Sequence, residues 1–200
     1  MSSMPTISIG VTGGIGSGKS YVCHMLEEMG IPVLYTDDEA RRLMTSDQSL
    51  VEALGELIGM PILHHDGTLR KSVISAFIRG DEQNAEKVNG LVHPAVRKSM
   101  HEWVSAQNVP VVAVECALLF ETQFDKDVDY TMAVSAPLDV RVERVMLRDG
   151  KNCAEVLQWN RMQMADSEKE RRADFVVVND GTAPLREQLT AVLDGIGRKR

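Results

Sequence analysis

One short stretch of the chain has the residue types and spacing of a phosphate-binding loop. Residues 13–20 read Gly-Gly-Ile-Gly-Ser-Gly-Lys-Ser, which matches the pattern G-x-x-x-x-G-K-[ST]. Glycines let the backbone wrap closely around an anion, and the start of the following helix adds partial positive charge. Lys19 offers a mobile cation to the β- and γ-phosphates, and the Ser20 hydroxyl is a hard oxygen ligand for Mg²⁺. The stretch therefore predicts a site for a nucleoside triphosphate.

The residues around this loop must decide what happens to the triphosphate, because motors, switches, ATPases and small-molecule kinases all carry such a loop. Asp37 follows the second predicted strand, residues 31–35, and lies near the loop if the two strands are neighbours. A carboxylate there can accept the proton of an attacking hydroxyl or help to place a metal ion. A second interpretation is that Asp37 caps the next helix, a role that Asp38 could also fill.

Arginines gather in the segment that ends at residue 172. Arg141, Arg144 and Arg148 are spaced by three and four residues, so they share one face of a predicted helix. One interpretation is a lid whose arginines neutralise the charge of a transferring phosphoryl group and exclude water. The other is a solvated face on which the arginines pair with acidic neighbours such as Asp149.

Composition limits the class of protein. The chain has 200 residues, of which 44% are hydrophobic and 26% charged, as is usual for one compact globular protein with at most some insertions. Its net charge of −7 disfavours non-specific binding to nucleic acids or membrane surfaces. We find no signal peptide in residues 1–10 and no apolar run of about 18 residues. Three distant cysteines, Cys23, Cys116 and Cys153, fit reduced core thiols, so we expect a cytoplasmic enzyme.

Strand and helix patterns alternate along most of the chain, which favours an α/β fold with a parallel sheet and helices on both faces. Ligands of such folds bind at the carboxyl ends of the strands, where the loop and Asp37 would both lie. The predicted strands cover residues 6–11, 31–35, 109–115, 128–134 and 174–179. The predicted helices outside residues 46–107 cover 19–29, 38–44, 137–148, 153–164 and 183–196.

Residues 46–107 differ from the rest because they are mostly helical, richer in charge and without a convincing core strand. We predict helices over 46–59, 70–78 and 81–107, the last disturbed at His93-Pro94, where one helical segment ends. The spacing alone favours a structural role for His93. The segment reads as an insertion between two strands that is large enough to form a substrate-sized pocket.

Short motifs carry a resemblance over nearly the whole chain. They are Thr12–Ser20, Gly30–Val33 followed by Asp37, Asp66–Lys71, Leu91–Pro94, Leu118–Glu121, Arg144–Asp149, Arg161–Gln163 and Ala173–Asn179. In this order they resemble the dephospho-CoA kinase family. The resemblance implies ATP-dependent phosphorylation of the ribose 3′-hydroxyl of dephospho-CoA, the last step of coenzyme A biosynthesis, giving CoA and ADP. We also expect a monomer, and the acidic net charge favours a chain without nucleic-acid or membrane partners.

The resemblance implies a P-loop NTPase three-layer fold with a parallel five-stranded sheet, a helical acceptor-binding insertion and a helical lid. Residues 1–45, 108–136 and 174–200 would form the nucleotide-binding core. Residues 46–107 would be the insertion that binds dephospho-CoA, and residues 137–173 would be the lid region.

Site roles are also carried over from the family by position. Asp37 would be the base that faces the 3′-hydroxyl, Ser20 would hold Mg²⁺, and Thr12 would lie near the reacting groups. Arg144 and Arg148 would stabilise the transferring charge. The residues expected to bind ATP are Gly14, Gly16, Ser17, Gly18, Lys19, Ser20, Tyr21 through its backbone N–H, and Asn179 near the adenine. Besides Asp37, the residues expected to hold dephospho-CoA are Lys71, His93 and Arg161.

Three positions depart from the family pattern. Tyr35 stands where many relatives have an acidic residue, Ala117 stands where proline is frequent, and Lys71 stands where arginine is common. Lysine lacks the planar fork of arginine, so the departure at Lys71 changes the expected acceptor contact. Two other functions stay open: a nucleotide-dependent switch or ATPase, and another small-molecule kinase that acts on nucleotides or shikimate.

Overall fold

The computed structural model describes residues 6–182 and 184–198. The chain divides into two compact units. The first unit comprises Met1–Leu34 and Gln107–Arg200, and the second comprises Tyr35–Ala106. The residue ranges expected for the nucleotide-binding core, the insertion and the lid remain a prediction.

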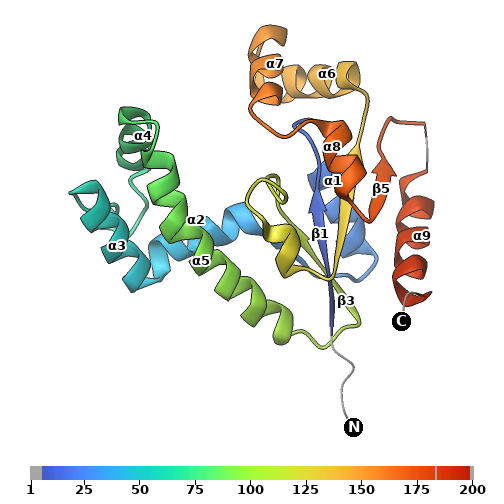
Figure 1. Ribbon diagram of the computed structural model, residues 1–200, viewed down its shortest axis with the longest axis horizontal. Helices are drawn as coiled ribbons and strands as arrows, with labels where there is room; N and C mark the ends of the chain where they lie inside the picture. Colours follow the sequence, from blue (N-terminus) through green and yellow to red (C-terminus); the bar gives the residue numbers. More distant parts are fainter. Residues whose placement is uncertain (1–5, 183, 199–200) are drawn as a thin grey trace. The chain divides into compact units, whose positions relative to one another are not determined.

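A five-stranded sheet in the order β2-β3-β1-β4-β5 organises the first unit (Figure 1). Strand β1 pairs in parallel with both β3 and β4, and β4 pairs in parallel with β5. All six residues of β1 are buried, as expected of a central strand in a covered sheet. The prediction of an α/β fold with a parallel sheet is therefore confirmed. The strands are β1 (Ile7–Thr12), β2 (Val33–Tyr35), β3 (Val111–Glu115), β4 (Tyr130–Ser135) and β5 (Phe175–Val178).

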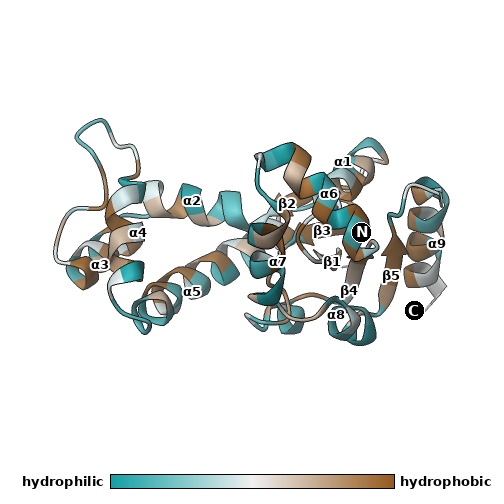
Figure 2. Cartoon of the chain, turned by 90° about the horizontal axis from the view of Figure 1, so that it is seen from above, coloured by the Kyte–Doolittle hydropathy of each residue, from teal (hydrophilic) through white to brown (hydrophobic). Residues whose placement is uncertain are grey.

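Helices cover the sheet because each carries an apolar face. Helix α1 (Lys19–Glu28) buries Val22, Cys23 and Leu26 and contacts β1 and β3. Helix α9 (Leu185–Arg198) contacts β5 and α1, whereas α8 (Asp166–Arg172) contacts β4. Seen along the strands, α1 and α8 lie on opposite sides of the sheet (Figure 2). The sheet therefore sits between helical layers.

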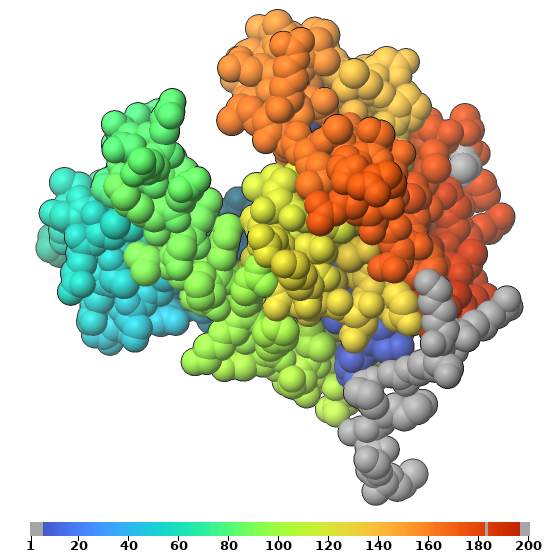
Figure 3. All heavy atoms as spheres, in the orientation of Figure 1, coloured from blue at the N-terminus to red at the C-terminus, as the bar shows by residue number. Residues whose placement is uncertain are grey.

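Helices α6 (Leu138–Asp149) and α7 (Cys153–Arg161) extend the first unit next to the phosphate-binding loop. Their buried residues Val142, Val145 and Val156 form an apolar cluster, and Ile15 of the loop packs against it. In the space-filling view the side chains of α6, α7 and α8 form a continuous layer (Figure 3). This packing brings the region predicted to be the lid against the loop. A short 3₁₀ helix, η1 (Phe124–Asp127), precedes β4.

The second unit is a group of helices around α5 (Asn84–Ser105). Helices α2 (Thr36–Ser46), α3 (Gln48–Ile58) and α4 (Lys71–Gly80) all contact α5. Their apolar stripes alternate with hydrophilic faces in Figure 2, which is typical of helices packed on one side. The buried residues of the four helices include Leu43, Leu54, Ile74, Val88, Val92, Val96 and Met100.

Three expectations from the sequence are wrong in detail, and one helix was missed. Pro94 lies inside α5, so His93-Pro94 does not end a helical segment. Helix α8 was not predicted, because its seven residues, DSEKERR, have no apolar periodicity. Cys23 and Cys116 are buried as expected, but Cys153 is exposed at the first residue of α7 and is not a core thiol. The strand predicted over residues 31–35 is shorter, Val33–Tyr35.

None of the helices in residues 6–182 and 184–198 combines the length and the apolar content that crossing a bilayer needs.

Candidate active site

The phosphate-binding loop joins the end of β1 to the start of α1. Gly16 and Gly18 have φ angles of 77° and 91°, in the left-handed region that residues with a Cβ atom rarely adopt. Gly18 is the residue that precedes α1, and the N–H of Val22 donates to its carbonyl oxygen over 3.0 Å. The glycines at these positions therefore set the turn that brings the loop onto the helix N-terminus.

Side chains from outside the loop also press against its glycines. A Cβ atom on Gly14 would collide with a carboxylate oxygen of Asp166, and one on Gly18 would collide with the amide of Asn179. A Cβ atom at either position would therefore require the end of the neighbouring side chain to shift. The loop is thus held between α8 and the residue that follows β5.

The loop fits a phosphate group on three grounds. Helix α1 has no capping side chain and no acidic residue in its first turn, so its partially positive N-terminus is not already neutralised. The Ser17 hydroxyl oxygen is buried and has no hydrogen-bond partner among the described residues. The Lys19 ammonium group donates to the Gly13 carbonyl oxygen over 2.9 Å, at the mouth of the loop. A bound phosphate would therefore meet the Lys19 ammonium group, the Ser17 hydroxyl and the backbone N–H groups at the start of α1.

Asn179 and Arg144 are brought to the loop. The Asn179 side-chain amide donates to the Ser17 carbonyl oxygen over 2.9 Å, and the Arg144 guanidinium donates to the Asn179 carbonyl oxygen over 2.9 Å. The nearest guanidinium nitrogen of Arg144 lies 3.9 Å from the place that a Cβ atom on Gly18 would occupy. A fixed cation therefore lies beside the part of the loop that starts α1.

The three arginines of α6 have different surroundings. Arg141 is buried, donates to the carbonyl oxygens of Ala136 and Ile15, and forms an ion pair with Asp166. Arg148 is 64% exposed and pairs with the neighbouring carboxylate of Asp149. The interpretation of a solvated face is therefore wrong for the buried Arg141, which holds the loop to α6 and α8.

Other predicted residues of this unit lie at its surface or at its centre. Ser20 and Tyr21 lie in the first turn of α1, and both are exposed. Arg161 is exposed as the last residue of α7. Thr12 is fully buried at the end of β1, and its hydroxyl donates to the Ala117 carbonyl oxygen over 3.2 Å.

The remaining predicted residues belong to the helical unit. Asp37 is exposed in the first turn of α2, and the residue that precedes this helix is Tyr35, so the interpretation of Asp37 as an N-terminal cap is wrong. Lys71 is exposed as the first residue of α4. His93 is half-buried on α5, where burial and the neighbouring Arg97 both lower its pKa. Helices α4 and α5 contact each other, so Lys71 and His93 lie on packed elements.

Comparison with known proteins gives the family. Residues 7–184 match the sequence model of the family described as dephospho-CoA kinase. The chain belongs to the dephospho-CoA kinase family. A dephospho-CoA kinase of Bacteroides fragilis is 39% identical over 188 residues, which are 94% of this chain and 91% of the relative. The resemblance stated from the motifs is therefore confirmed.

Solved structures agree with this membership. A crystal structure of a Thermus thermophilus protein is similar with a TM-score of 0.83 and 36% identity, covering 96% of this chain and 98% of that one. The dephospho-CoA kinase from Campylobacter jejuni is 18% identical and has a TM-score of 0.69, covering 96% of this chain and 98% of that one. At that identity the second similarity shows the shared fold. Family membership makes the chain a kinase, a transferase with a P-loop nucleotide-binding fold.

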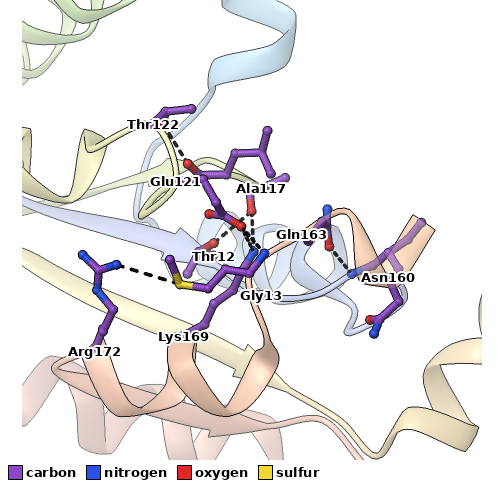
Figure 4. Close-up of polar contacts among 12 residues, drawn as sticks. Thr12, Gly13, Ala117, Glu121, Thr122, Asn160, Gln163, Lys169 and Arg172 are labelled. Atoms are coloured by element: carbon purple, nitrogen blue, oxygen red, sulfur yellow. Dashed lines mark hydrogen bonds and ion pairs between the residues drawn. The ribbon is translucent and has the colours of Figure 1, made fainter. Parts of the chain in front are cut away.

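Two residues that the sequence motifs left without a role form an ion pair in the first unit. Lys169 of α8 is 1% exposed, and its ammonium group forms an ion pair with Glu121 at 3.0 Å (Figure 4). Burial raises the pKa of Glu121, but the N–H groups of Met164 and Glu121 and the Lys169 ammonium group outweigh it, so this pKa lies below its usual value. Glu121 was part of a quoted motif, whereas Lys169 lies in the helix that was not predicted.

Proposed function

We propose that the chain transfers the γ-phosphoryl group of ATP to the ribose 3′-hydroxyl of dephospho-CoA, giving CoA and ADP. The family match over residues 7–184 carries this proposal. The loop between β1 and α1, with its glycine turn, buried hydroxyl and uncapped helix start, supports the nucleotide half of the reaction.

ATP is assigned to the loop. Lys19 and the backbone N–H groups of the loop bind its phosphates, and the N–H of Tyr21 donates to the α-phosphate. The Ser20 hydroxyl lies in the first turn of α1, where it can serve as a ligand for Mg²⁺. When bound, Mg²⁺ neutralises negative charge on the phosphate oxygens. Asn179, whose side chain contacts Ser17, is assigned to the adenine of ATP.

Dephospho-CoA is assigned to Asp37 and to residues of the helical unit. The Asp37 carboxylate accepts the proton of the 3′-hydroxyl, the hydroxyl oxygen forms a bond to the γ-phosphorus, and the bond from this phosphorus to the leaving oxygen of ADP breaks. Lys71 and His93 hold the acceptor together with Arg161. The exposed position of Asp37 and Lys71 leaves both side chains accessible to a substrate.

Arg144 and Arg148 stabilise the negative charge that spreads over the transferring phosphoryl group. Arg144 lies beside the loop through its contact with Asn179, whereas Arg148 must leave Asp149 to reach the phosphates. We assign residues 137–173 to the lid and residues 46–107 to the acceptor-binding insertion. We further infer a cytoplasmic monomer that performs the last step of coenzyme A biosynthesis, without nucleic-acid or membrane partners.

The proposal is tested by an assay of ADP release with purified chain, ATP and Mg²⁺. Dephospho-CoA, AMP, nucleosides and shikimate are offered separately as acceptors, and the product of the active mixture is identified by mass spectrometry. We expect ADP release only with dephospho-CoA, with one phosphoryl group added to it. Equal turnover without an acceptor would indicate an ATPase or switch and would overturn the proposal, and so would turnover with shikimate or AMP only.

A further inference from the structure

A buried ammonium group lies where α8 meets the strand ends of the sheet. Lys169 is 1% exposed, and its ammonium group donates to the Ala117 carbonyl oxygen over 3.0 Å as well as pairing with Glu121 (Figure 4). Taking a charge out of water costs several kcal/mol unless partners compensate it. If α8 had only a structural role, an apolar residue at position 169 would fill the same space without the cost of burying a charge. The position of the charge therefore calls for an explanation.

The first partner of Lys169 leads to the phosphate-binding loop through Thr12. The Ala117 carbonyl oxygen accepts hydrogen bonds from both the Lys169 ammonium group and the Thr12 hydroxyl. Thr12 is the last residue of β1 and directly precedes the loop. The neighbouring N–H of Cys116 donates to the Val11 carbonyl oxygen over 2.9 Å. Lys169 thus ties α8 to the point at which β1 passes into the loop.

The second partner of Lys169, Glu121, is connected to the loop through the segment that precedes α8. A carboxylate oxygen of Glu121 accepts the N–H of Met164 over 2.9 Å. The preceding residue, Gln163, accepts the N–H of Ile15 in the loop over 3.1 Å through its side-chain oxygen. The Lys169–Glu121 pair therefore fixes both the segment after β3 and the segment before α8. The segment after β3 holds Thr12, which directly precedes the loop, and the segment before α8 holds Ile15 within the loop.

We propose that Lys169 is a positioning residue for phosphoryl transfer, which holds Thr12 and the Gln163–Ile15 contact in place at the first half of the loop. Its side chain is buried, so it acts through these neighbours. Displacement of a catalytic constellation by about 1 Å can cost on the order of 100-fold in rate. The second half of the loop is held separately, by Asn179 and Arg144. Loss of Lys169 should consequently lower turnover more than ATP affinity. The inference rests on the proposed function, since turnover of dephospho-CoA is one of its readouts.

The test begins with Lys169→Met, which keeps the length of the side chain and removes its charge and donors. We expect kcat to fall about 10- to 100-fold while KM for ATP changes by less than about 3-fold. Amide hydrogen exchange of a peptide covering residues 13–19 should become faster, because the N–H of Ile15 loses its fixed acceptor. Arg171→Met is the matched control, since Arg171 lies on the same helix in an exposed pair with Glu168, and it should leave kcat and exchange unchanged.

A double variant separates positioning from folding. Lys169→Met leaves the Glu121 carboxylate without its cation, and the variant can unfold for that reason alone. Lys169→Met combined with Glu121→Gln removes both charges and keeps an acceptor for the N–H of Met164. We expect this double variant to melt near the temperature of the unchanged chain and still to show low kcat and fast exchange. Restored kcat in the double variant overturns the inference. If neither variant folds, Lys169 acts in folding stability and the inference is overturned as well.

The two proposals fail in different ways. If the unchanged chain does not phosphorylate dephospho-CoA, the proposed function fails, while exchange of residues 13–19 in the variants still tests the positioning of the loop. If the unchanged chain is active and Lys169→Met keeps its kcat and its exchange rate, only the role of Lys169 is wrong.

Discussion

Arg141 and Arg148 show how far the surroundings of identical side chains can differ on a single helix. Both belong to α6 and lie two turns apart, yet one is buried against the loop and the other is exposed beside Asp149. The buried guanidinium is stabilised by backbone carbonyls and a carboxylate, which satisfy a planar fork of donors. Arg141 therefore holds the loop in place, and the role proposed at the phosphates concerns Arg144 and Arg148 only.

The strongest prediction for a single residue concerns Asp37. Asp37→Asn keeps the size of the side chain but removes the carboxylate that accepts the proton, so kcat should fall about 100-fold or more. ATP binding, measured by calorimetry, should stay near that of the unchanged chain. Asp38→Asn is the matched control, because this neighbouring carboxylate is paired with Arg41, and its kcat should be unchanged. Near-normal turnover of Asp37→Asn would show that another group is the base.

Arg144→Ala should lower kcat more than it weakens ATP binding, if the guanidinium acts on charge that develops in the transition state. The variant loses a donor to the Asn179 carbonyl oxygen, so a small change in affinity is also expected. Steady-state kinetics and ATP titration measure the two effects separately. Arg186→Ala is a suitable control, since Arg186 lies in an exposed pair with Glu28. If the variant changes only the affinity for ATP, Arg144 stabilises bound ATP and not the transition state.

The Glu121 carboxylate should make stability depend on pH. Its pKa lies below the usual value of 4.5, so the ionised form is favoured in the folded chain. This contribution is fully present above about pH 4.5 and is lost as the pH falls through the lower pKa of the folded chain. Glu121→Gln should therefore lower the melting temperature at pH 7 and have a smaller effect at pH 3. Melting curves across this range test the prediction, and an equal loss at both pH values contradicts it.

At the scale of elements, two glycines in different settings should respond in opposite ways to alanine. Gly90 lies inside α5, and an added Cβ atom would have no neighbour within 4 Å among the described residues. Gly90→Ala should raise the free energy of unfolding by about 0.5–1 kcal/mol, because glycine is the poorer helix former. Urea denaturation measures this gain. Gly18→Ala, in contrast, meets a positive φ and the Asn179 amide, so it should lower stability.

Pro94 shows how packing between elements decides where a helix ends. Proline removes one backbone hydrogen bond and normally breaks a helix. Helix α5 nevertheless runs from Asn84 to Ser105, since it packs against α2, α3 and α4 and buries Val88, Val92, Val96 and Met100. The apolar contacts on both sides of Pro94 outweigh the local cost. The spacing of these apolar residues by four predicts the helix, but only the packed structure shows that it continues through Pro94.

For the molecule as a whole, phosphoryl transfer should require a divalent cation. Excess EDTA should abolish ADP release in the presence of ATP and dephospho-CoA, and added MgCl₂ should restore it. The readout is the ADP-release assay of the unchanged chain, with melting temperature as the control for folding. Full activity in EDTA would show that the reaction does not need Mg²⁺ and that Ser20 has no role as a metal ligand.

Much of this protein follows from its sequence because the relevant signals are local. The loop at residues 13–20 is recognisable since phosphate binding needs glycine backbone, a lysine and a hydroxyl at fixed spacing. The strands and most helices are recognisable since side-chain period reports which face is buried. The motifs that occur in a fixed order along the chain likewise indicate the family.

The tertiary structure decided the features that depend on residues distant in sequence. The ion pair between Lys169 and Glu121 joins two segments that are distant in sequence. The polar sequence of α8 has no apolar periodicity from which a buried charge could be predicted. The different surroundings of Arg141 and Arg148 likewise follow from what α6 packs against. Burial of a charge depends on partners that arrive from elsewhere in the fold, so the physical cause of these contacts exists only once the chain is folded.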